Sequence, residues 1–534
     1  MPFLTALFIV MVTVPLSMKL AWRWRFVDLP DARKLHAAAV PRVGGIGMVL
    51  GTVLAVALWL EIDAGLRVVL AGIGLLCLFG ILDDRWDLDY RLKFLGQALA
   101  VWIVVGCGDV VVRRLELFGA HALPDVLAYP LSFLFLLGTT NAMNLSDGLD
   151  GLAAGLGILS LAAIAYLADL AGGDEAVAVA VAIIGAVLGF LRYNTHPAMV
   201  FMGDTGSQFL GFSIGVLAIL ATQKVNTAIA GALPVLILGL PVVDTLLVMA
   251  DRVSRRVSPF KPDRNHFHHK LLSLGFDHCE AVLAIYALQA LFIGLAVLLR
   301  YESDGLVLGV YAALFAGLAA FFPVALGLRW RIRIFTQGYK SPLTHHWENL
   351  AGGQRVERAA FHGSTLALIL VLAMGSFAGT GVGADLGACA LGVLLAWLLA
   401  ALARALPLVE RPALYSCVIL AVYLIGDGGQ AGWWRYGHYA VVALGCLVGI
   451  GVRLSRRYFS VTPSDFLVLF MLVAAASLPV FSGTNHARLG VEAAVVLYGL
   501  EYLPRRRGGA SLALRCGGML ALAVVAARGL AMNP

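Results

Sequence analysis

"NLSDGLDGLAAGLGILSLAAIAYLADL", from Asn144 to Leu170, places two carboxylates beside a long apolar run. The apolar part covers about 20 residues, enough for a helix to cross roughly 30 Å of hydrocarbon. The whole chain has this character, because 60% of its 534 residues are hydrophobic, 13% are charged and its mean hydropathy is +0.88. Soluble globular proteins are less apolar. The sequence therefore predicts an all-α integral membrane protein, a polytopic helix bundle.

Apolar stretches of this length recur along the chain, and we predict about 18 transmembrane helices with the N-terminus outside. In that topology about 29 of the 39 Lys and Arg residues lie in cytoplasmic loops and about 8 lie outside, which is the positive-inside asymmetry. The first stretch is interpreted as a retained span, since no basic region precedes it. The predicted spans are 3–20, 44–61, 66–82, 94–112, 123–140, 150–171, 175–192, 207–221, 226–250, 280–299, 305–328, 359–378, 384–403, 412–426, 437–452, 464–482, 487–503 and 510–528.

The net charge of +7 does not indicate nucleic-acid binding, because the basic residues follow the membrane topology. Polar loops rich in Asp, Asn, His and Arg end near residue 328. We therefore predict a catalytic membrane domain of about 11 helices over 1–328, a cytoplasmic linker over 329–358, and a C-terminal membrane domain of about 7 helices and unknown role over 359–534. In that last domain we expect Glu492, Glu501 and Arg515 to pair locally or lie near an interface.

Six aspartates gather near the predicted cytoplasmic ends of the spans. They are Asp83, Asp84, Asp147, Asp150, Asp204 and Asp244. A carboxylate at membrane depth costs about 2.5–3.5 kcal/mol on insertion scales, so a cluster on one side indicates a functional site. The alternative is that each aspartate only caps a helix, as Asp does well. Six on one side, with glycines among them, favour a site.

The segment "MGDTGSQFLG", residues 202–211, flanks Asp204 with glycines just before a predicted span. Backbone N–H groups at such a helix start form a seat for an anion. Asp204 adds a hard carboxylate oxygen, and Mg²⁺ is commonly held by one or two carboxylates together with substrate phosphates. The same glycines are also ordinary chemistry for a helix start.

The loop "SPFKPDRNHFHHKLLSLG", residues 258–275, is dense in basic side chains and holds Arg264, His266, His268 and His269. Recognition of a pyrophosphate is one interpretation, since Arg and His donate hydrogen bonds to phosphate oxygens. A zinc site is a second interpretation, although no cysteine lies nearby and the cations would repel the ion. A solvated basic loop is the third.

Carboxylates, an anion seat and a basic loop on one face together predict phosphoryl transfer. No Walker P-loop, dinucleotide-binding fingerprint or kinase signature occurs in the sequence. The alternatives are a transporter with a carboxylate-lined cytoplasmic site and a non-catalytic scaffold.

Five stretches resemble the polyprenyl-phosphate N-acetylhexosamine-1-phosphate transferases, the WecA, TagO and MraY group of bacterial membrane enzymes. The stretch from Val27 and the form "DDRWD", which ends in aspartate where the MraY branch has lysine, resemble the WecA and TagO branch. The stretches are "VDLPDARKLHAAAVPRVGG" from Val27, "DDRWD" from Asp83, "NAMNLSDGLDGL" from Asn141, "GFLRYNTHPAMVFMGDTGS" from Gly189 and "PDRNHFHH" from Pro262.

This resemblance implies transfer of N-acetylhexosamine 1-phosphate from a UDP-sugar, with UDP-N-acetylglucosamine expected, to undecaprenyl phosphate, with release of UMP. It implies a multi-pass protein of the bacterial inner membrane with a cytoplasmic active site. Mg²⁺ is the implied cofactor, with Mn²⁺ as a substitute. The implied partners are the two substrates and membrane lipids, and a homodimer is left open. Another donor sugar and a covalent two-step mechanism also stay open.

The resemblance also implies roles for individual residues. Asp204 would bind the metal, Asp83 and Asp84 would form a catalytic pair, and His268 would act with them. The implied substrate-binding residues are Lys93, Asn144, Asp147, Asp150, Asn194, Phe201, Arg264, His266 and His269, with Phe201 stacked on uracil.

Overall fold

The computed structural model is almost entirely helical and divides into two compact units near residue 335. It describes residues 1–28, 39–116, 122–256, 258, 265–328, 353–378, 382–403, 406–427, 436–454, 463, 465, 486–507 and 512–531. Assigning catalysis to the first unit and a linker to 329–358 stays a prediction.

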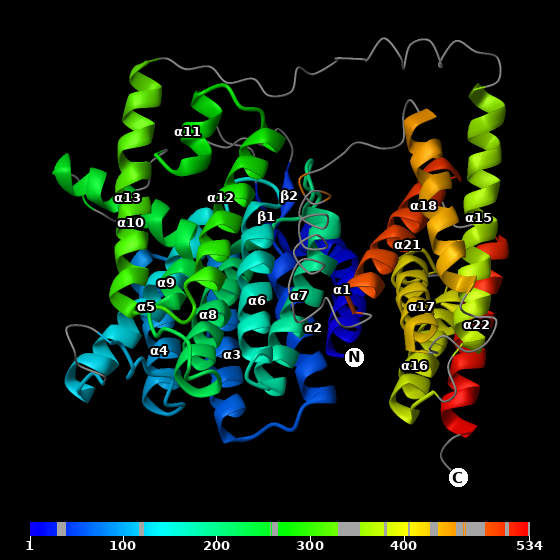
Figure 1. Cartoon of the computed structure of the whole chain (residues 1–534), viewed down its shortest axis with the longest axis horizontal. Helices are drawn as coiled ribbons and strands as arrows, with labels where there is room; N and C mark the ends of the chain where they lie inside the picture. The colour runs from blue at the N-terminus through cyan, green and yellow to red at the C-terminus, as the bar shows by residue number, and fades with distance from the viewer. Residues whose placement is uncertain are drawn as a thin grey trace. The chain divides into compact units, whose positions relative to one another are not determined.

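The first unit contains helices α1 to α13 (Figure 1). Its one sheet in the described residues pairs β1 (Val27–Asp28) with β2 (Val40–Pro41), antiparallel. The helices are α1 (Pro2–Trp24), α2 (Gly44–Trp59), α3 (Ala64–Trp86), α4 (Tyr90–Gly106), α5 (Asp125–Ser146), α6 (Leu152–Asp169), α7 (Asp174–Asn194), α8 (Gly203–Leu220) with a π-turn η1 (Ala221–Val225), α9 (Leu233–Ile237), α10 (Gly239–Ser254), α11 (Phe267–Ser273), α12 (His278–Leu298) and α13 (Asp304–Gly327).

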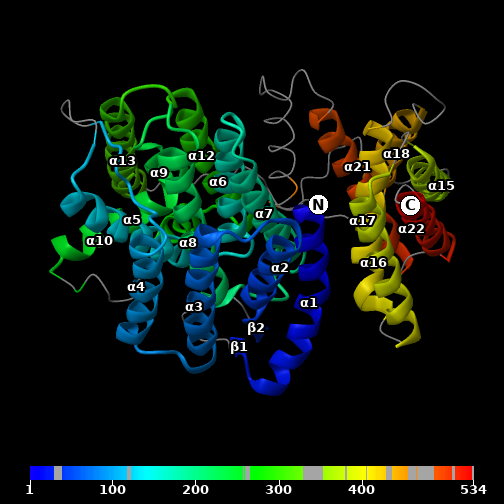
Figure 2. The ribbon, with the colours of Figure 1, turned by 90° about the horizontal axis from the view of Figure 1, so that it is seen from below.

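Helix α8 is the core of this unit, and nearly all of its residues are buried. In Figure 2, α1 to α4 line one side of the unit, α12 and α13 lie on the opposite side, and α8 lies between them. Helices α2, α3 and α5 pack directly against α8. Small residues permit this approach, since a methyl group on Gly80 of α3 would collide with the backbone of Thr205 at the start of α8.

Twelve helices among the described residues are long and apolar enough to cross a membrane, and the chain is a multi-pass membrane protein. Helix α2 and parts of α18 (Gly437–Leu454) and α21 (His486–Arg507) are shorter apolar helices. Nearly all of the predicted span 464–482 lies outside the described residues. The count of 18 spans and the outside N-terminus stay predictions.

The prediction of one continuous span over 226–250 is wrong, because the chain breaks between α9 and α10. Pro241 lacks a backbone N–H and disfavours a continuous helix through this point. The buried Gln289 of α12 repairs the break, since its Oε1 accepts from Leu240 N at 3.1 Å and its Nε2 donates to Ile237 O at 2.8 Å. Satisfying backbone groups in this way is what permits irregular backbone inside a membrane protein.

The second unit is also helical, and polar pairs link its helices. Glu410 accepts from Arg515 Nε at 3.0 Å, and Glu492 pairs with His438 Nδ1 at 2.8 Å. Glu492 and Arg515 therefore each pair with a side chain of another helix in this unit. The side chain of Glu501 lies outside the described residues. The helices are α15 (Gly353–Phe377), α16 (Ala384–Leu402), α17 (Leu406–Asp427), α18, α21 and α22 (Leu512–Ala531).

Candidate active site

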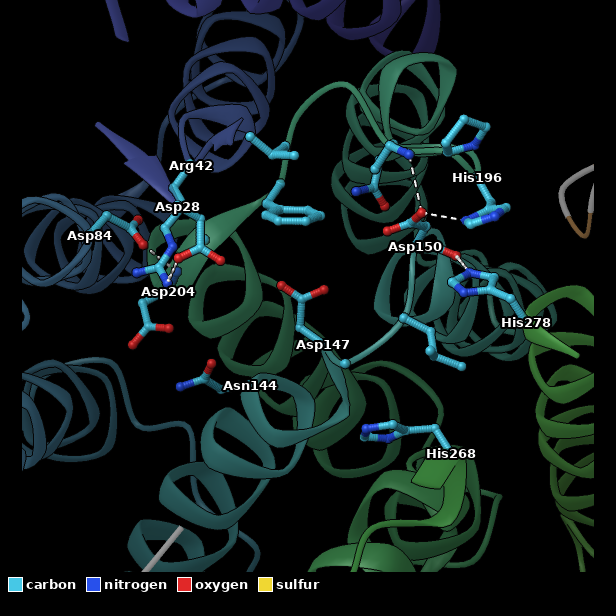
Figure 3. Close-up of a pocket in the computed structure, with 18 of the residues that line it drawn as sticks. Asp28, Arg42, Asp84, Asn144, Asp147, Asp150, His196, Asp204, His268 and His278 are labelled. Atoms are coloured by element: carbon cyan, nitrogen blue, oxygen red, sulfur yellow. Dashed lines mark hydrogen bonds and ion pairs between the residues drawn. The ribbon is translucent and has the colours of Figure 1, made fainter. Parts of the chain in front are cut away.

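A cavity of about 640 Å³ opens at the end of the first unit where α3, α5 and α7 end and where α6, α8 and α12 begin (Figure 3). Its walls come from segments that are far apart in the sequence. The lining residues are Asp28, Val40, Arg42, Asp84, Asn144, Asp147, Gly148, Leu149, Asp150, Asn194, His196, Pro197, Ala198, Phe201, Gly203, Asp204, His268, His269 and His278. Four of the five stretches that carry the family resemblance thus contribute at least two residues each to one cavity.

Asp84 holds the start of α8 in place. Its Oδ1 accepts from Asp204 N at 2.8 Å, and its Oδ2 accepts from Thr205 N at 3.1 Å and from Thr205 Oγ1 at 2.7 Å. Gly203, at φ 66°, makes the turn that aims these N–H groups at the carboxylate. Both oxygens of Asp84 are therefore engaged by the positive end of the α8 dipole.

Lys93 of α4 connects two of the predicted carboxylates. Its Nζ lies 3.1 Å from Asp83 Oδ2 and also forms an ion pair with Asp204 Oδ2. The Asn144 amide completes the group: in the orientation that satisfies both of its ends, it donates to Asp204 Oδ1 and accepts from Lys93 Nζ, each at 3.2 Å. Asp83 is only 8% exposed and its Oδ1 accepts from Leu88 N at 2.8 Å. The structure thus brings Asp83, Lys93, Asn144 and Asp204 together.

Asp147 lies in the middle of the cavity, between the Asp204 side and the histidine side (Figure 3). Burial, followed by the negative charges of Asp84 and Asp150, raises the pKa of Asp147 to about 7, while the positive charge of Arg42 opposes this rise. An additional cation in the cavity would favour the charged form of this carboxyl.

Asp150, His196 and His278 form a cluster on the far wall (Figure 3). Asp150 Oδ2 lies 2.6 Å from His196 Nδ1 and accepts from Ala198 N at 3.1 Å, and the Asp150 carbonyl lies 3.4 Å from His278 Nε2. The two imidazoles are stacked, with centroids 4.0 Å apart and 24° between their planes. Ring lone pairs lie in the ring planes, so these rings do not aim at one ion. We interpret the cluster as a clamp that holds three segments together.

The histidines of the basic loop divide into two groups. His268 and His269 line the cavity, and His266, 6% exposed, is absent from the described lining and lies against Asp244. Burial, followed by the neighbouring imidazoles of His269, His266 and His278, lowers the pKa of His268 to about 3. His268 is therefore neutral near pH 7 and can donate one hydrogen bond from its ring. Arg264 lies outside the described residues.

Asn194 and Phe201 both line the cavity but are held through backbone contacts. Asn194 is 2% exposed, accepts from Gly151 N at 2.8 Å and donates to Val200 O at 2.9 Å. The backbone of Phe201 bonds to Pro41 O and Gly44 N. The structure thus places an aromatic ring in the wall, and its stacking on uracil stays a prediction.

The cavity wall also contains four residues that were not predicted from the sequence as site residues: Asp28, Arg42, His196 and His278. Arg42 pairs with Asp28 across the small sheet, and both line the cavity. They occur in the stretch from Val27 that carries the resemblance, so position in that motif was an available signal. His196 and His278 lie far apart in the sequence, and only the folded structure reveals their contact.

Asp204 is the residue of this group that could hold Mg²⁺, because its carboxylate offers hard oxygen ligands. In the structure its Oδ2 pairs with Lys93 Nζ and its Oδ1 accepts from the Asn144 amide. Among the described residues, no group of three carboxylate or imidazole ligands includes Asp204. A cation at Asp204 would therefore take its remaining ligands from phosphate oxygens and water, as Mg²⁺ prefers.

Comparison with known proteins identifies the family of this chain. Residues 66–222 match the family model for Glycosyl transferase family 4. The chain is similar to the probable undecaprenyl-phosphate N-acetylglucosaminyl 1-phosphate transferase of Bacillus subtilis, at 34% identity over 344 residues, 63% of this chain and 95% of that protein. The chain belongs to the polyprenyl-phosphate N-acetylhexosamine-1-phosphate transferase family. The protein is thus a membrane phosphotransferase.

Two further relatives also match only part of this chain. The chain is 36% identical over 299 residues to the decaprenyl-phosphate N-acetylglucosaminephosphotransferase of Mycolicibacterium smegmatis, covering 50% of this chain and 73% of that protein. The chain is 30% identical over 290 residues to the undecaprenyl-phosphate alpha-N-acetylglucosaminyl 1-phosphate transferase of Escherichia coli K12, covering 53% of this chain and 79% of that protein. Each of the three alignments leaves more than a third of the present chain unmatched.

Proposed function

We propose that the protein transfers N-acetylglucosamine 1-phosphate from UDP-N-acetylglucosamine to undecaprenyl phosphate and releases UMP. The relatives named above support the sugar and the lipid class. The observation that carries the proposal is the meeting of Asp83, Lys93 and Asp204 at the start of α8, in one group beside the cavity. This group offers both a cation site and a fixed positive charge to phosphate groups.

The reaction joins two anions, so charge repulsion and alignment dominate its barrier. Asp204, with support from Asn144, would hold Mg²⁺ against the nucleotide diphosphate. When bound, Mg²⁺ neutralises charge on the diphosphate oxygens and stabilises the leaving phosphate. Lys93 supplies a second positive charge, and the neutral ring of His268 donates a hydrogen bond to a phosphate oxygen.

In the chemical step an oxygen of the lipid phosphate attacks the sugar-linked phosphorus of the diphosphate. A new P–O bond forms, the bond to the bridging oxygen breaks, and that oxygen leaves on UMP. The second pKa of a phosphomonoester lies near 6, so the lipid phosphate is largely dianionic at neutral pH and needs no strong base. Asp83 then orients this phosphate through Lys93, which it holds at 3.1 Å.

The same proposal places the cavity at the cytoplasmic side of the bacterial inner membrane. Basic residues support this side. Arg23, Arg25, Arg42, Arg85, Arg91, Lys93, Arg252, Arg255, Arg256 and Lys270 lie in or beside the segments at the cavity end, whereas Arg67, Arg113, Arg114, Lys224 and Arg300 lie at the other helix ends. Such an excess is typical of cytoplasmic loops. Helix α1 runs from its N-terminus to β1 in the cavity wall, so the N-terminus lies on the opposite side.

The test is release of UMP by the purified full-length protein in nanodiscs, with UDP-N-acetylglucosamine, undecaprenyl phosphate and MgCl₂. We expect release that stops with EDTA and returns with Mg²⁺, and that falls at least about 100-fold in Asp204→Ala. Asp174→Ala is the matched control, since Asp174 also lies in the first turn of a helix but at the other end of the bundle. Equal rates with UDP-N-acetylgalactosamine would contradict the proposed donor.

A further inference from the structure

The basic loop is anchored from below by a buried carboxylate of the broken span. Asp244 of α10 is 5% exposed, and its two oxygens accept from two consecutive residues of the loop. Oδ1 accepts from Phe267 N, the first residue of α11, at 2.9 Å, and Oδ2 lies 3.0 Å from His266 Nδ1. Leaving such buried groups unpaired is costly, so this contact fixes where α11 begins.

The position of α11 in turn decides where His268 points. His266 and His268 lie with their rings parallel, 5° between planes and 5.9 Å between centroids. The His268 ring also packs against Gly148, where a methyl group would collide with the imidazole. His268 is thus held between the anchored loop and the Asp147–Asp150 segment, with its ring in the cavity wall (Figure 3).

Asp244 lies in mostly apolar surroundings, and its hydrogen-bond partners are residues of the basic loop. Apolar residues Leu152, Leu156 and Ile285 lie around the space between Asp244 and His268. Asp244 itself is absent from the described lining of the large cavity. A charged group kept in such surroundings needs good partners, and Asp244 finds them in the residue pair directly preceding His268.

We propose that Asp244 is a positioning residue for the transferase reaction, and that His266 serves with it in a buried dyad instead of binding the diphosphate. Asp244 sets the start of α11 and the tilt of His266, and through them it aims the His268 ring at the phosphates. The inference rests on the proposed function for its kinetic readout. Its structural part, the placement of His268 by Asp244, stands apart from it.

The experiment is a double-mutant cycle on UMP release with Asp244→Ala, His268→Ala and the double variant. A displacement of about 1 Å in a catalytic group can cost about 100-fold in rate, and we expect a loss of that size in Asp244→Ala. Because Asp244 acts through His268, the double variant should be no slower than His268→Ala alone. Wild-type rates in Asp244→Ala, or losses that multiply in the double variant, would overturn the inference.

Two further variants separate positioning from folding. Asp244→Asn should keep most of the activity, since the amide oxygen can accept from Phe267 N–H and the amide nitrogen can donate to the other tautomer of His266. Asp174→Ala is the control, because Asp174 lies in the first turn of α7 at the other end of the bundle, away from the basic loop. It should leave the rate unchanged. If Asp244→Ala does not fold, His266→Ala replaces it in the same cycle.

A readout without turnover keeps this inference distinct from the proposed function. The ring ¹³C–¹H resonance of His268, assigned by its loss in His268→Gln, should shift in Asp244→Ala and stay in place in Asp174→Ala. An unmoved resonance in Asp244→Ala would refute the placement even if UMP is released. A shifted resonance in Asp244→Ala, together with no UMP release by the wild-type protein, would refute the proposed function alone.

Discussion

Asp84 of α3 accepts hydrogen bonds from both the backbone N–H and the hydroxyl of Thr205 of α8, at 3.1 and 2.7 Å. The pair joins the end of one helix to the start of another, and Asp204 lies directly before Thr205. The geometry of the proposed metal ligand therefore depends on a carboxylate that has its own oxygens occupied. Resemblance grouped Asp83 and Asp84 as one catalytic pair, whereas the structure gives them different partners.

Replacement of Asp84 should affect both stability and activity. In Asp84→Ala the N–H groups of Asp204 and Thr205 lose their acceptor, and unpaired buried donors cost about 1–3 kcal/mol each. We expect a lower unfolding temperature in detergent and loss of UMP release. Asp87→Asn is the control, since Asp87 is largely exposed and its left-handed backbone suits Asn. An Asp84→Ala protein as stable as wild type would contradict this account.

Lys93 should be required for rate and should not be replaceable by Arg. Its ammonium contacts Asp83 and Asp204 as a compact point charge, and the planar fork of Arg does not fit that position. We expect Lys93→Gln and Lys93→Arg each to lower kcat/KM by about 100-fold or more. Arg91→Gln, at an exposed position two residues away, should stay near wild type. Steady-state UMP release measures all three, and full activity in Lys93→Arg would exclude the point-charge role.

Asp147 should make the ligand-free protein less stable as pH rises. Its pKa in the folded protein is raised to about 7 from an ordinary value of 3.8, so between these values the folded state binds more protons than the unfolded state. The resulting stabilisation is lost as pH rises through about 7. Asp147→Asn, which stays neutral, should therefore raise the unfolding temperature relative to wild type at pH 8 and have less effect at pH 5.

The control for this pH dependence is Asp87→Asn, an exposed carboxylate beside the same site. It should change the unfolding temperature, relative to wild type, by the same amount at pH 5 and at pH 8. Asp147→Asn should also release UMP more slowly, because the carboxylate lies in the middle of the cavity. An Asp147→Asn protein that loses stability at pH 8 would show that the charged form is stabilising.

Gly148 should tolerate no side chain, because a methyl group there would occupy the place of the His268 ring. We expect Gly148→Ala to slow UMP release by about 100-fold through displacement of His268. Gly138→Ala in α5 is the matched control, since nothing lies within 4 Å of the added methyl group. Ala is the better helix former there, so the control should be at least as stable as wild type. Equal rates for the two variants would show that the contact between Gly148 and His268 is not important for the reaction.

The sequence by itself determined the helical membrane class and most helix positions, because hydropathy over about 20 residues is a local property. It also determined which residue types gather at one face, since carboxylates and histidines in an apolar chain are costly unless they have a use. The family resemblance rested on short motifs such as "NLSDGLDG", whose residues are all local too. These predictions needed no knowledge of which helices pack together.

Only the tertiary structure decided which partner each polar side chain finds. Two adjacent aspartates separated into an anchor for α8 and a partner of Lys93, and three neighbouring histidines separated into one that faces Asp244 and two that line the cavity. The broken span at Gly239 likewise depends on Gln289, which lies on another helix far along the chain. Hydrogen bonds between distant segments form through packing in three dimensions, which local patterns of residues do not encode.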